Sequence, residues 1–175
     1  MLTGFYIFHK KHPTGLEQLP QTSAPLYAFK TCLRHIYFAH DESEKLDLSP
    51  DFEVFQNQKA YQFIAEVLCG LHSPVVGETE VFGQFKNFWQ EGQFLPHPFP
   101  YALKQIFSNL ITDVKKVRGL HLQDLGGQSY GSLIRKDLTS PSDVALIGAG
   151  SFAADILPWI YKDQNSIQVF ARCPN

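Results

Sequence analysis

Apolar residues recur at two different spacings along the chain, and the change of spacing predicts an α+β domain. Short β-branched and aromatic runs at residues 4–9, 26–30 and 34–39 are typical of strands. From Asn57 onward, apolar residues recur every three or four positions, as on one face of a helix. We therefore expect a small mixed or antiparallel sheet packed against several helices.

The helical spacing predicts three helices, at about residues 57–70, 81–89 and 101–118. The third is the clearest, because its apolar residues fall on one face and its last turn carries Lys115, Lys116 and Arg118, which the helix dipole favours there. The aromatic residues of the second helix are more typical of a core than of a base-stacking surface. The acidic stretch at residues 41–51 is more typical of a solvated loop than of a metal site.

A different pattern begins near residue 142. An apolar run at 143–147 leads directly into a Gly-x-Gly-x-x-Ala turn, and a second apolar run follows at 166–171. This arrangement is typical of a dinucleotide-binding strand–turn–helix–strand unit, in which Gly148 permits the tight turn and Gly150 lets the backbone approach a pyrophosphate. The alternative is such a turn that binds nothing. Pro158 is expected to kink the intervening helix.

The residue after the second run decides which dinucleotide is expected. An NAD site commonly has an acidic residue there, whereas this chain has Arg172, which suits the 2′-phosphate of NADP(H). The predicted cofactor is therefore NADPH. The residues expected to hold it are Gly148, Ala149, Gly150, Ser151, Phe152, Ala153 and Arg172.

These patterns predict two domains. Residues 1–120 would form the α+β domain, 121–141 a linker with a turn at Gly126–Gly127 and a short helix near 132–138, and 142–175 the beginning of a Rossmann-type α/β domain. A full nucleotide domain needs more strands and helices. The sequence therefore represents either a fragment or a vestigial nucleotide unit.

Composition narrows the class of protein. With 44% hydrophobic and 18% charged residues the chain can form a packed core, and its net charge of −2 argues against a charge-driven nucleic-acid binder. Three cysteines without a CxxC pair predict neither a disulfide framework nor a zinc site. There is no signal peptide and no apolar run long enough to cross a membrane, so a cytoplasmic protein is expected.

Two short segments carry the candidate chemistry. Thr31-Cys32-Leu33-Arg34 lies between two predicted strands, and a nearby cation favours the thiolate that acts as a nucleophile. Taken alone, this pattern is more typical of a buried, inert cysteine. The other segment is GLHSPVVGETEVFGQ at residues 70–84.

In this order, with KKVR at 115–118 and the glycine-rich turn, these segments resemble glutamyl-tRNA reductase, the first enzyme of the five-carbon route to tetrapyrroles. The first strand followed by His9-Lys10 is also similar to the start of that family, so the resemblance spans essentially the whole chain. The family's chains are much longer. Their remaining nucleotide domain and their dimerisation helices have no counterpart here, so the oligomeric state stays open.

The resemblance implies a reaction. Cys32 would attack the ester of glutamyl-tRNA to form a thioester, NADPH would deliver hydride to release glutamate-1-semialdehyde, and Arg34 would hold the glutamate carboxylate. The family analogy adds glutamate-1-semialdehyde aminotransferase as an expected partner. The implied substrate-binding residues are Thr31, Leu33, Arg34, Ser73, Glu78, Thr79, Glu80 and Gln84.

The chain departs from the family pattern at several positions. The most serious is Phe63, where the family has a histidine proposed as acid/base, because a phenyl ring cannot move protons. His72, His35 and His40 are the candidates to replace it. The other departures are Leu33 for Asn, Ile36 for Glu, His72 for Asp and Glu80 for Gln.

These departures leave two hypotheses open: an active, divergent reductase, or a degenerate, non-catalytic homologue acting as a binding or regulatory module. A third hypothesis, which does not depend on the resemblance, is an unrelated NADP-binding oxidoreductase domain.

Overall fold

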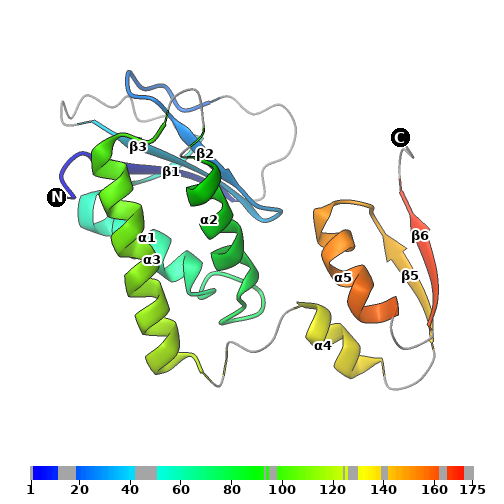
Figure 1. Ribbon diagram of the computed structural model, residues 1–175. Helices are drawn as coiled ribbons and strands as arrows, with labels where there is room; N and C mark the ends of the chain where they lie inside the picture. Colours follow the sequence, from blue (N-terminus) through cyan, green and yellow to red (C-terminus); the bar gives the residue numbers. More distant parts are fainter. Residues whose placement is uncertain are drawn as a thin grey trace.

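The computed structural model describes residues 2–11, 19–41, 51–92, 94, 98–123, 125, 130–138, 142–161 and 165–171 (Figure 1). Most of the acidic stretch, the glycine pair at 126–127 and the predicted NADP-selective Arg172 lie outside these residues.

The first sheet is antiparallel and has four strands in the order β2–β3–β1–β4. Three of its strands were predicted. The fourth was not, because its four residues run directly into a helix and are held as a strand by pairing with β1 rather than by a pattern of their own. The strands are β1 (Phe5–Lys11), β2 (Tyr27–Lys30), β3 (Arg34–His40) and β4 (Glu53–Gln56).

Three helices cover one face of this sheet: α1 (Asn57–Leu68), α2 (Glu80–Glu91) and α3 (Tyr101–His121) (Figure 1). Because side chains alternate along a strand, Phe5 and Ile7 of β1 face the helices while Tyr6 and Phe8 enter a smaller cluster on the other face. Phe107 of α3 is at the centre of the larger core, and its ring lies 4.9 Å from that of Phe38. The predicted α+β architecture is confirmed.

The remaining elements form a separate strand–helix–strand unit with a preceding helix. Strands β5 and β6 are parallel, as the sequence predicted, and α5 connects them. The helix is not interrupted at Pro158, although a kink was expected there. The elements are α4 (Tyr130–Asp137), β5 (Asp143–Ile147), α5 (Ser151–Tyr161) and β6 (Ser166–Phe170).

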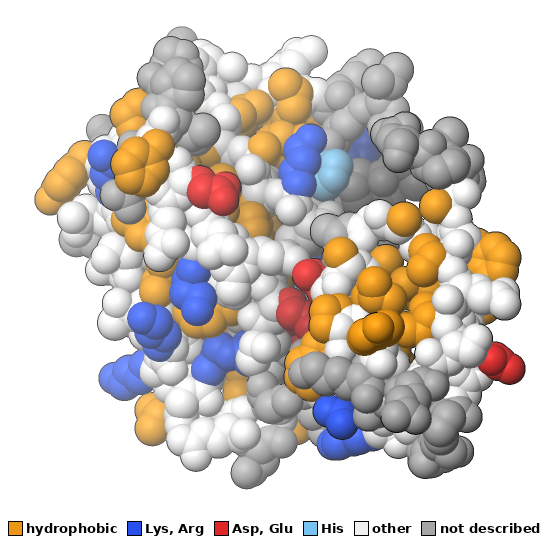
Figure 2. Space-filling model, turned by 45° about the vertical axis from the view of Figure 1, so that its right-hand side comes forward, with side chains coloured by type: hydrophobic (Ala, Val, Ile, Leu, Met, Phe, Trp, Pro, Cys, Tyr) orange, Lys and Arg blue, Asp and Glu red, His pale blue; other side chains and the backbone are white. Residues whose placement is uncertain are grey.

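This unit has little core of its own in the described part of the chain. No residue of β5 or β6 is buried, and Ile147 is 87% exposed. Figure 2 shows hydrophobic side chains gathered on the surface of this unit. Helices α4 and α5 pack closely at Gly131, where an added Cβ would lie 2.2 Å from the ring of Trp159.

The central position of Phe107 predicts a large effect of Phe107→Ala. The side chain is completely buried among other rings, so its removal leaves a cavity and is expected to lower the free energy of unfolding by about 3–5 kcal/mol. Phe94→Ala is the matched control, because that ring is 88% exposed. Urea denaturation would measure both. Equal, small losses for the two variants would contradict the central role of Phe107.

Candidate active site

Cys32 lies at the tip of the turn that joins β2 to β3. The turn is closed by the Thr31 amide, which donates to the Arg34 carbonyl at 2.9 Å, and by the Leu33 amide, which donates to the Thr31 hydroxyl at 3.4 Å. The Cys32 side chain is exposed, whereas Cys69 is buried. The interpretation of Cys32 as a buried cysteine is therefore wrong.

The segment at residues 70–79 is a compact loop that depends on two glycines. Gly70 and Gly77 have φ values of 75° and 80°, which side chains rarely adopt. A Cβ at Gly70 would also lie 2.8 Å from the backbone nitrogen of Glu78. The Gly70 carbonyl accepts from the amides of Ser73 and Gly77, so the loop folds back on its own start.

Arg118 of α3 fastens this loop to the helices around it. Its guanidinium donates to the carbonyls of Leu68 at 3.2 Å, Gly77 at 2.7 Å and Glu78 at 3.0 Å. From the sequence, Arg118 was a favourable charge at a helix end or a contact to tRNA phosphates. The structure shows that Arg118 joins the end of α1, the loop and the start of α2.

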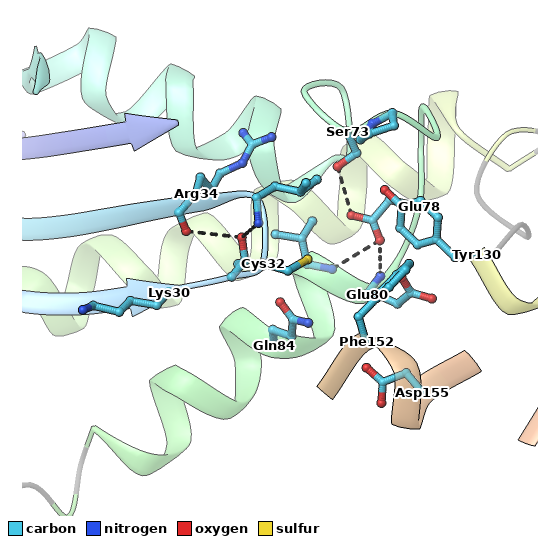
Figure 3. A pocket seen from close by; sticks show the side chains of 14 residues that line it. Lys30, Cys32, Arg34, Ser73, Glu78, Glu80, Gln84, Tyr130, Phe152 and Asp155 are labelled. Atoms are coloured by element: carbon cyan, nitrogen blue, oxygen red, sulfur yellow. Dashed lines mark hydrogen bonds between the residues drawn. The ribbon is translucent and has the colours of Figure 1, made fainter. Parts of the chain in front are cut away.

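Glu78 is almost fully buried, and its carboxylate accepts hydrogen bonds from the first backbone amides of α2. One oxygen accepts from the Ser73 hydroxyl at 3.1 Å, and the other accepts from the amides of Glu80 at 2.5 Å and Val81 at 3.3 Å (Figure 3). Negative charge at a helix N-terminus is stabilised by the free amides and the dipole. The carboxylate is therefore held in one position.

The hairpin tip, the loop and α2 enclose a cavity of about 800 Å³ around Cys32. Tyr130 of α4 and Phe152 of α5 lie across it from the hairpin, with their rings 5.1 Å apart (Figure 3). Of the predicted substrate-binding residues, all except Thr79 line it together with Cys32: Thr31, Leu33, Arg34, Ser73, Glu78, Glu80 and Gln84.

Sequence reasoning missed several residues of this cavity. They are Lys30, Pro74, Val81, Tyr130 and Asp155. Lys30 directly precedes the Thr31–Arg34 segment, and Pro74 and Val81 lie within the segment at 70–84, so these three could have been included. Tyr130 and Asp155 reach the cavity only through packing between the two parts of the chain, for which no local pattern exists.

Of the predicted cofactor residues, only Phe152 reaches this cavity; Gly148, Ala149, Gly150 and Ala153 do not line it. Gly148 has a φ of 108°, and an added Cβ at Gly148 or Gly150 would meet no atom within 4 Å. The turn is therefore tight and open, as a phosphate approaching the backbone would require. The Ser151 side chain and Arg172 lie outside the described residues.

Charged groups in the cavity are perturbed by burial. Burial lowers the pKa of Arg34, against the opposing effects of Glu78, Tyr130 and Cys32, and the guanidinium donates to the His72 carbonyl at 2.5 Å. Burial also raises the pKa of the Glu80 carboxyl, and the neighbouring charge of Glu78 adds to this. Glu80 is thus a carboxyl beside the thiol that protonates more readily than usual.

The expected replacements for the absent histidine are not in this cavity. His72 does pack against Phe63, with ring centres 5.5 Å apart, but it lines a neighbouring cavity rather than that of Cys32. His35 and His40 line neither of these two cavities.

Comparison with known proteins places the chain in a family. Residues 6–119 match the family model described as "Glutamyl-tRNAGlu reductase, N-terminal domain". This chain belongs to the glutamyl-tRNA reductase family. The match covers both the Cys32 hairpin and the loop that holds Glu78.

Individual relatives agree with this assignment. A glutamyl-tRNA reductase of Akkermansia muciniphila is 34% identical over 139 residues, which are 75% of this chain and 40% of that protein. One of Methanococcus aeolicus is 31% identical over 133 residues, 71% of this chain and 34% of that protein. The chain thus spans less than half the length of these relatives.

A solved structure agrees in fold. The glutamyl-tRNA reductase of Methanopyrus kandleri superposes with a TM-score of 0.62 at 20% sequence identity, covering 98% of this chain and 50% of that one. Within the residues described, no helix combines the length and apolar character that a bilayer crossing demands.

The contacts of Arg118 predict that Arg118→Met destabilises the loop. Methionine keeps much of the aliphatic packing but leaves three carbonyls without their donor, so the free energy of unfolding should fall by about 2–3 kcal/mol. Lys116→Met, on an exposed position of the same helix, is the control. Urea denaturation tests both, and a loss below about 0.5 kcal/mol for Arg118→Met would show that the loop does not need this contact.

Proposed function

We propose that this chain forms the glutamyl-binding and thioester-forming part of a glutamyl-tRNA reductase, with Cys32 as the nucleophile. One observation carries the proposal: an exposed thiol shares a single cavity with polar side chains from two segments some 40 residues apart, the Cys32 hairpin and the loop and helix at 73–84. Family membership supports the same reaction.

The step assigned to Cys32 is a transfer of the glutamyl group. The sulfur attacks the ester carbonyl carbon, a carbon–sulfur bond forms, and the bond to the ribose oxygen of the tRNA breaks. The proton lost by the thiol ends on that ribose oxygen. The products are a glutamyl thioester on Cys32 and a tRNA with a free hydroxyl.

The cavity has complementary charges for a glutamyl group. Arg34 is the cation assigned to its side-chain carboxylate, because a guanidinium pairs well with a carboxylate. Glu78, held in place by Ser73 and the α2 amides, is available to the α-ammonium group. With its carboxylate and ammonium group bound in this way, the glutamyl group would present its ester carbonyl to the hairpin tip that carries Cys32.

The open turn at Gly148 and Gly150 fits a dinucleotide, and the parallel β5–α5–β6 unit is the arrangement such a site requires. We assign the backbone of residues 148–153 to the pyrophosphate of NADPH, and Arg172 to its 2′-phosphate. When bound, NADPH supplies the hydride that reduces the thioester to an aldehyde. Residues 1–120 are then the catalytic domain, 121–141 a linker, and 142–175 the start of the nucleotide domain.

The experiment for this function is capture of the thioester. The protein is mixed with glutamyl-tRNA that carries labelled glutamate, without NADPH, and label on the protein is measured after acid quenching. Label is expected on the natural chain and on Cys69→Ser, and none on Cys32→Ser. Circular dichroism shows that each variant is folded.

A second candidate function rests on Phe63. The family's acid/base histidine is replaced here by a ring that is 7% exposed and stacked on Phe55, with ring centres 4.1 Å apart. A chain without proton transfer at this position could serve as a binding or regulatory module. Absence of label from folded natural protein that still binds glutamyl-tRNA would establish this alternative and end the catalytic one.

Proton transfer to the leaving ribose oxygen is assigned to Glu80. Its carboxyl lines the cavity with Cys32, and burial raises its pKa, so it holds its proton to higher pH than a carboxyl in water. A general acid loses its effect as pH rises through its pKa. Because the thiolate fraction of Cys32 rises with pH while the protonated fraction of Glu80 falls, the rate of thioester formation in the natural chain should level off as the pH rises through this pKa.

Glu80→Gln removes the proton but keeps the size of the side chain. It should slow thioester formation by about 10²-fold at pH values where Glu80 is protonated. It should also remove the change of slope that the rate shows as the pH passes the pKa of Glu80. Single-turnover label capture between pH 4 and 8 would measure the effect, with Glu91→Gln on the same helix as the control. An unchanged pH profile in Glu80→Gln would exclude Glu80 as the acid.

A further inference from the structure

Positively charged side chains gather at the end of the first sheet that carries Cys32. Strands β1, β2 and β3 contain no Asp or Glu, although acidic residues outnumber Lys and Arg by 17 to 15 in the whole chain. The cations at this end of the three strands are Lys10, Lys11, Lys30 and Arg34. The positive charge is therefore a local feature that the overall composition does not predict.

The strand register places two of the lysines in one row across the sheet. Lys30 of β2 is paired with His35 of β3, and His35 is paired with Lys10 of β1. Paired residues point to the same face, and this face is the one away from the helices, because Tyr37 and Phe8 lie two positions further along it in the smaller core cluster. We call Lys30, His35 and Lys10 the basic row. Its two lysines are on alternate strands, so their backbones lie about 10 Å apart.

The other two cations belong to the opposite face of the sheet. Lys11 and Arg34 are the next pair along β1 and β3, and side chains alternate along a strand. Both line a second cavity, between β1, β4 and α1, together with Phe63 and His72. Of these four residues, only Arg34 also lines the Cys32 cavity. Lys11 and Arg34 are therefore separate from the basic row.

Each ammonium group of the basic row is held over an aromatic ring. The Nζ of Lys30 lies 5.6 Å from the ring centre of Tyr37, and the Nζ of Lys10 lies 5.6 Å from that of Phe52. Both rings are buried in the smaller core cluster. A ring attracts an ammonium group without cancelling its charge, and ordering the side chain beforehand lowers the entropy cost of binding an anion. His35 adds a ring N–H donor in any protonation state.

The basic row begins at the rim of the Cys32 cavity, because Lys30 also lines that cavity. Its side chain extends along the hairpin and away from Phe152 and Asp155 of α5 (Figure 3). An anion on the row would therefore lie on the hairpin side of the cavity, away from the glycine-rich turn that precedes α5. A nucleic acid esterified at its 3′ end matches this arrangement, since it presents an ester to Cys32 and continues past Lys30 as a series of phosphates.

We propose that the basic row binds the backbone phosphates at the 3′ end of the tRNA. This inference rests on the proposed function for the identity of the nucleic acid. Lys30 binds the phosphate nearest the ester and Lys10 binds one further along the strand, with His35 donating between them. Contacts of this kind position a nucleic acid without reading its bases. A local row of cations also lets a chain of net negative charge bind RNA.

The test is the affinity of the chain for uncharged glutamate tRNA, measured by fluorescence anisotropy over a series of salt concentrations. Lys30→Gln and Lys10→Gln should each weaken binding about threefold at low salt. Each should also reduce the slope of log affinity against log salt by about 0.7, the value for one phosphate contact in a single strand. Lys116→Gln is the matched control and should change neither quantity, because it removes the same charge from α3 on the other face of the sheet. Circular dichroism shows that each variant is folded.

A shortened tRNA locates the contact. Removing the last three nucleotides of the 3′ end should weaken binding to the natural chain. Lys30→Gln should then have no further effect, because the phosphate that Lys30 binds is gone. An undiminished effect of Lys30→Gln on the shortened tRNA would place the contact elsewhere and overturn the inference.

Binding of uncharged tRNA involves no ester, so its outcome is separable from that of thioester capture. Loss of affinity and of slope in Lys30→Gln and Lys10→Gln supports the basic row even if the natural chain acquires no label. Label on Cys32 with affinity and slope unchanged in both lysine variants overturns the basic row and leaves the proposed function standing. Equal losses in Lys116→Gln, or no binding of tRNA to the natural chain at low salt, would overturn the basic row as well.

Discussion

The contact between Arg118 and three backbone carbonyls is the constraint on which the Cys32 cavity depends. The guanidinium reaches the last turn of α1, the loop and Glu78, two residues before α2. A planar group with several fixed donors can satisfy carbonyls that diverge in this way, whereas a lysine ammonium has no such geometry. By holding the Glu78 carbonyl, it also fixes the backbone from which the Glu78 carboxylate reaches the α2 amides. The polar wall opposite Cys32 is thus a consequence of one side chain in α3.

Much of the fold follows from hydrophobic spacing. The strands β1 and β3 and the helix α3 combine long apolar patterns with clear ends, and each was predicted close to its observed bounds. β4 could not be predicted, because its pairing with β1 is a tertiary contact. The hairpin turn was located from its flanking strands, and the exposure of Cys32 follows from the tightness of that turn. Tyr130 and Asp155 could not be assigned, since they join the cavity through contacts between distant segments.

The positions where the chain departs from its family are separated in space. Leu33 and Glu80 line the Cys32 cavity, Phe63 and His72 line the second cavity, and Ile36 is completely buried in the core. Ile36 faces the helices, where an apolar side chain packs without needing a partner. The departures in the first cavity leave its thiol and its buried carboxylate in place. In the second, the Phe63 ring packs against the His9 imidazole, with ring centres 4.9 Å apart.

Arg34 connects the two cavities, and its donors are limited. One Nη2 donor is already used by the His72 carbonyl, so the remaining donors must serve a carboxylate in the first cavity, the second cavity, or both. Two anions on one guanidinium share its charge and repel each other, which makes their binding mutually unfavourable.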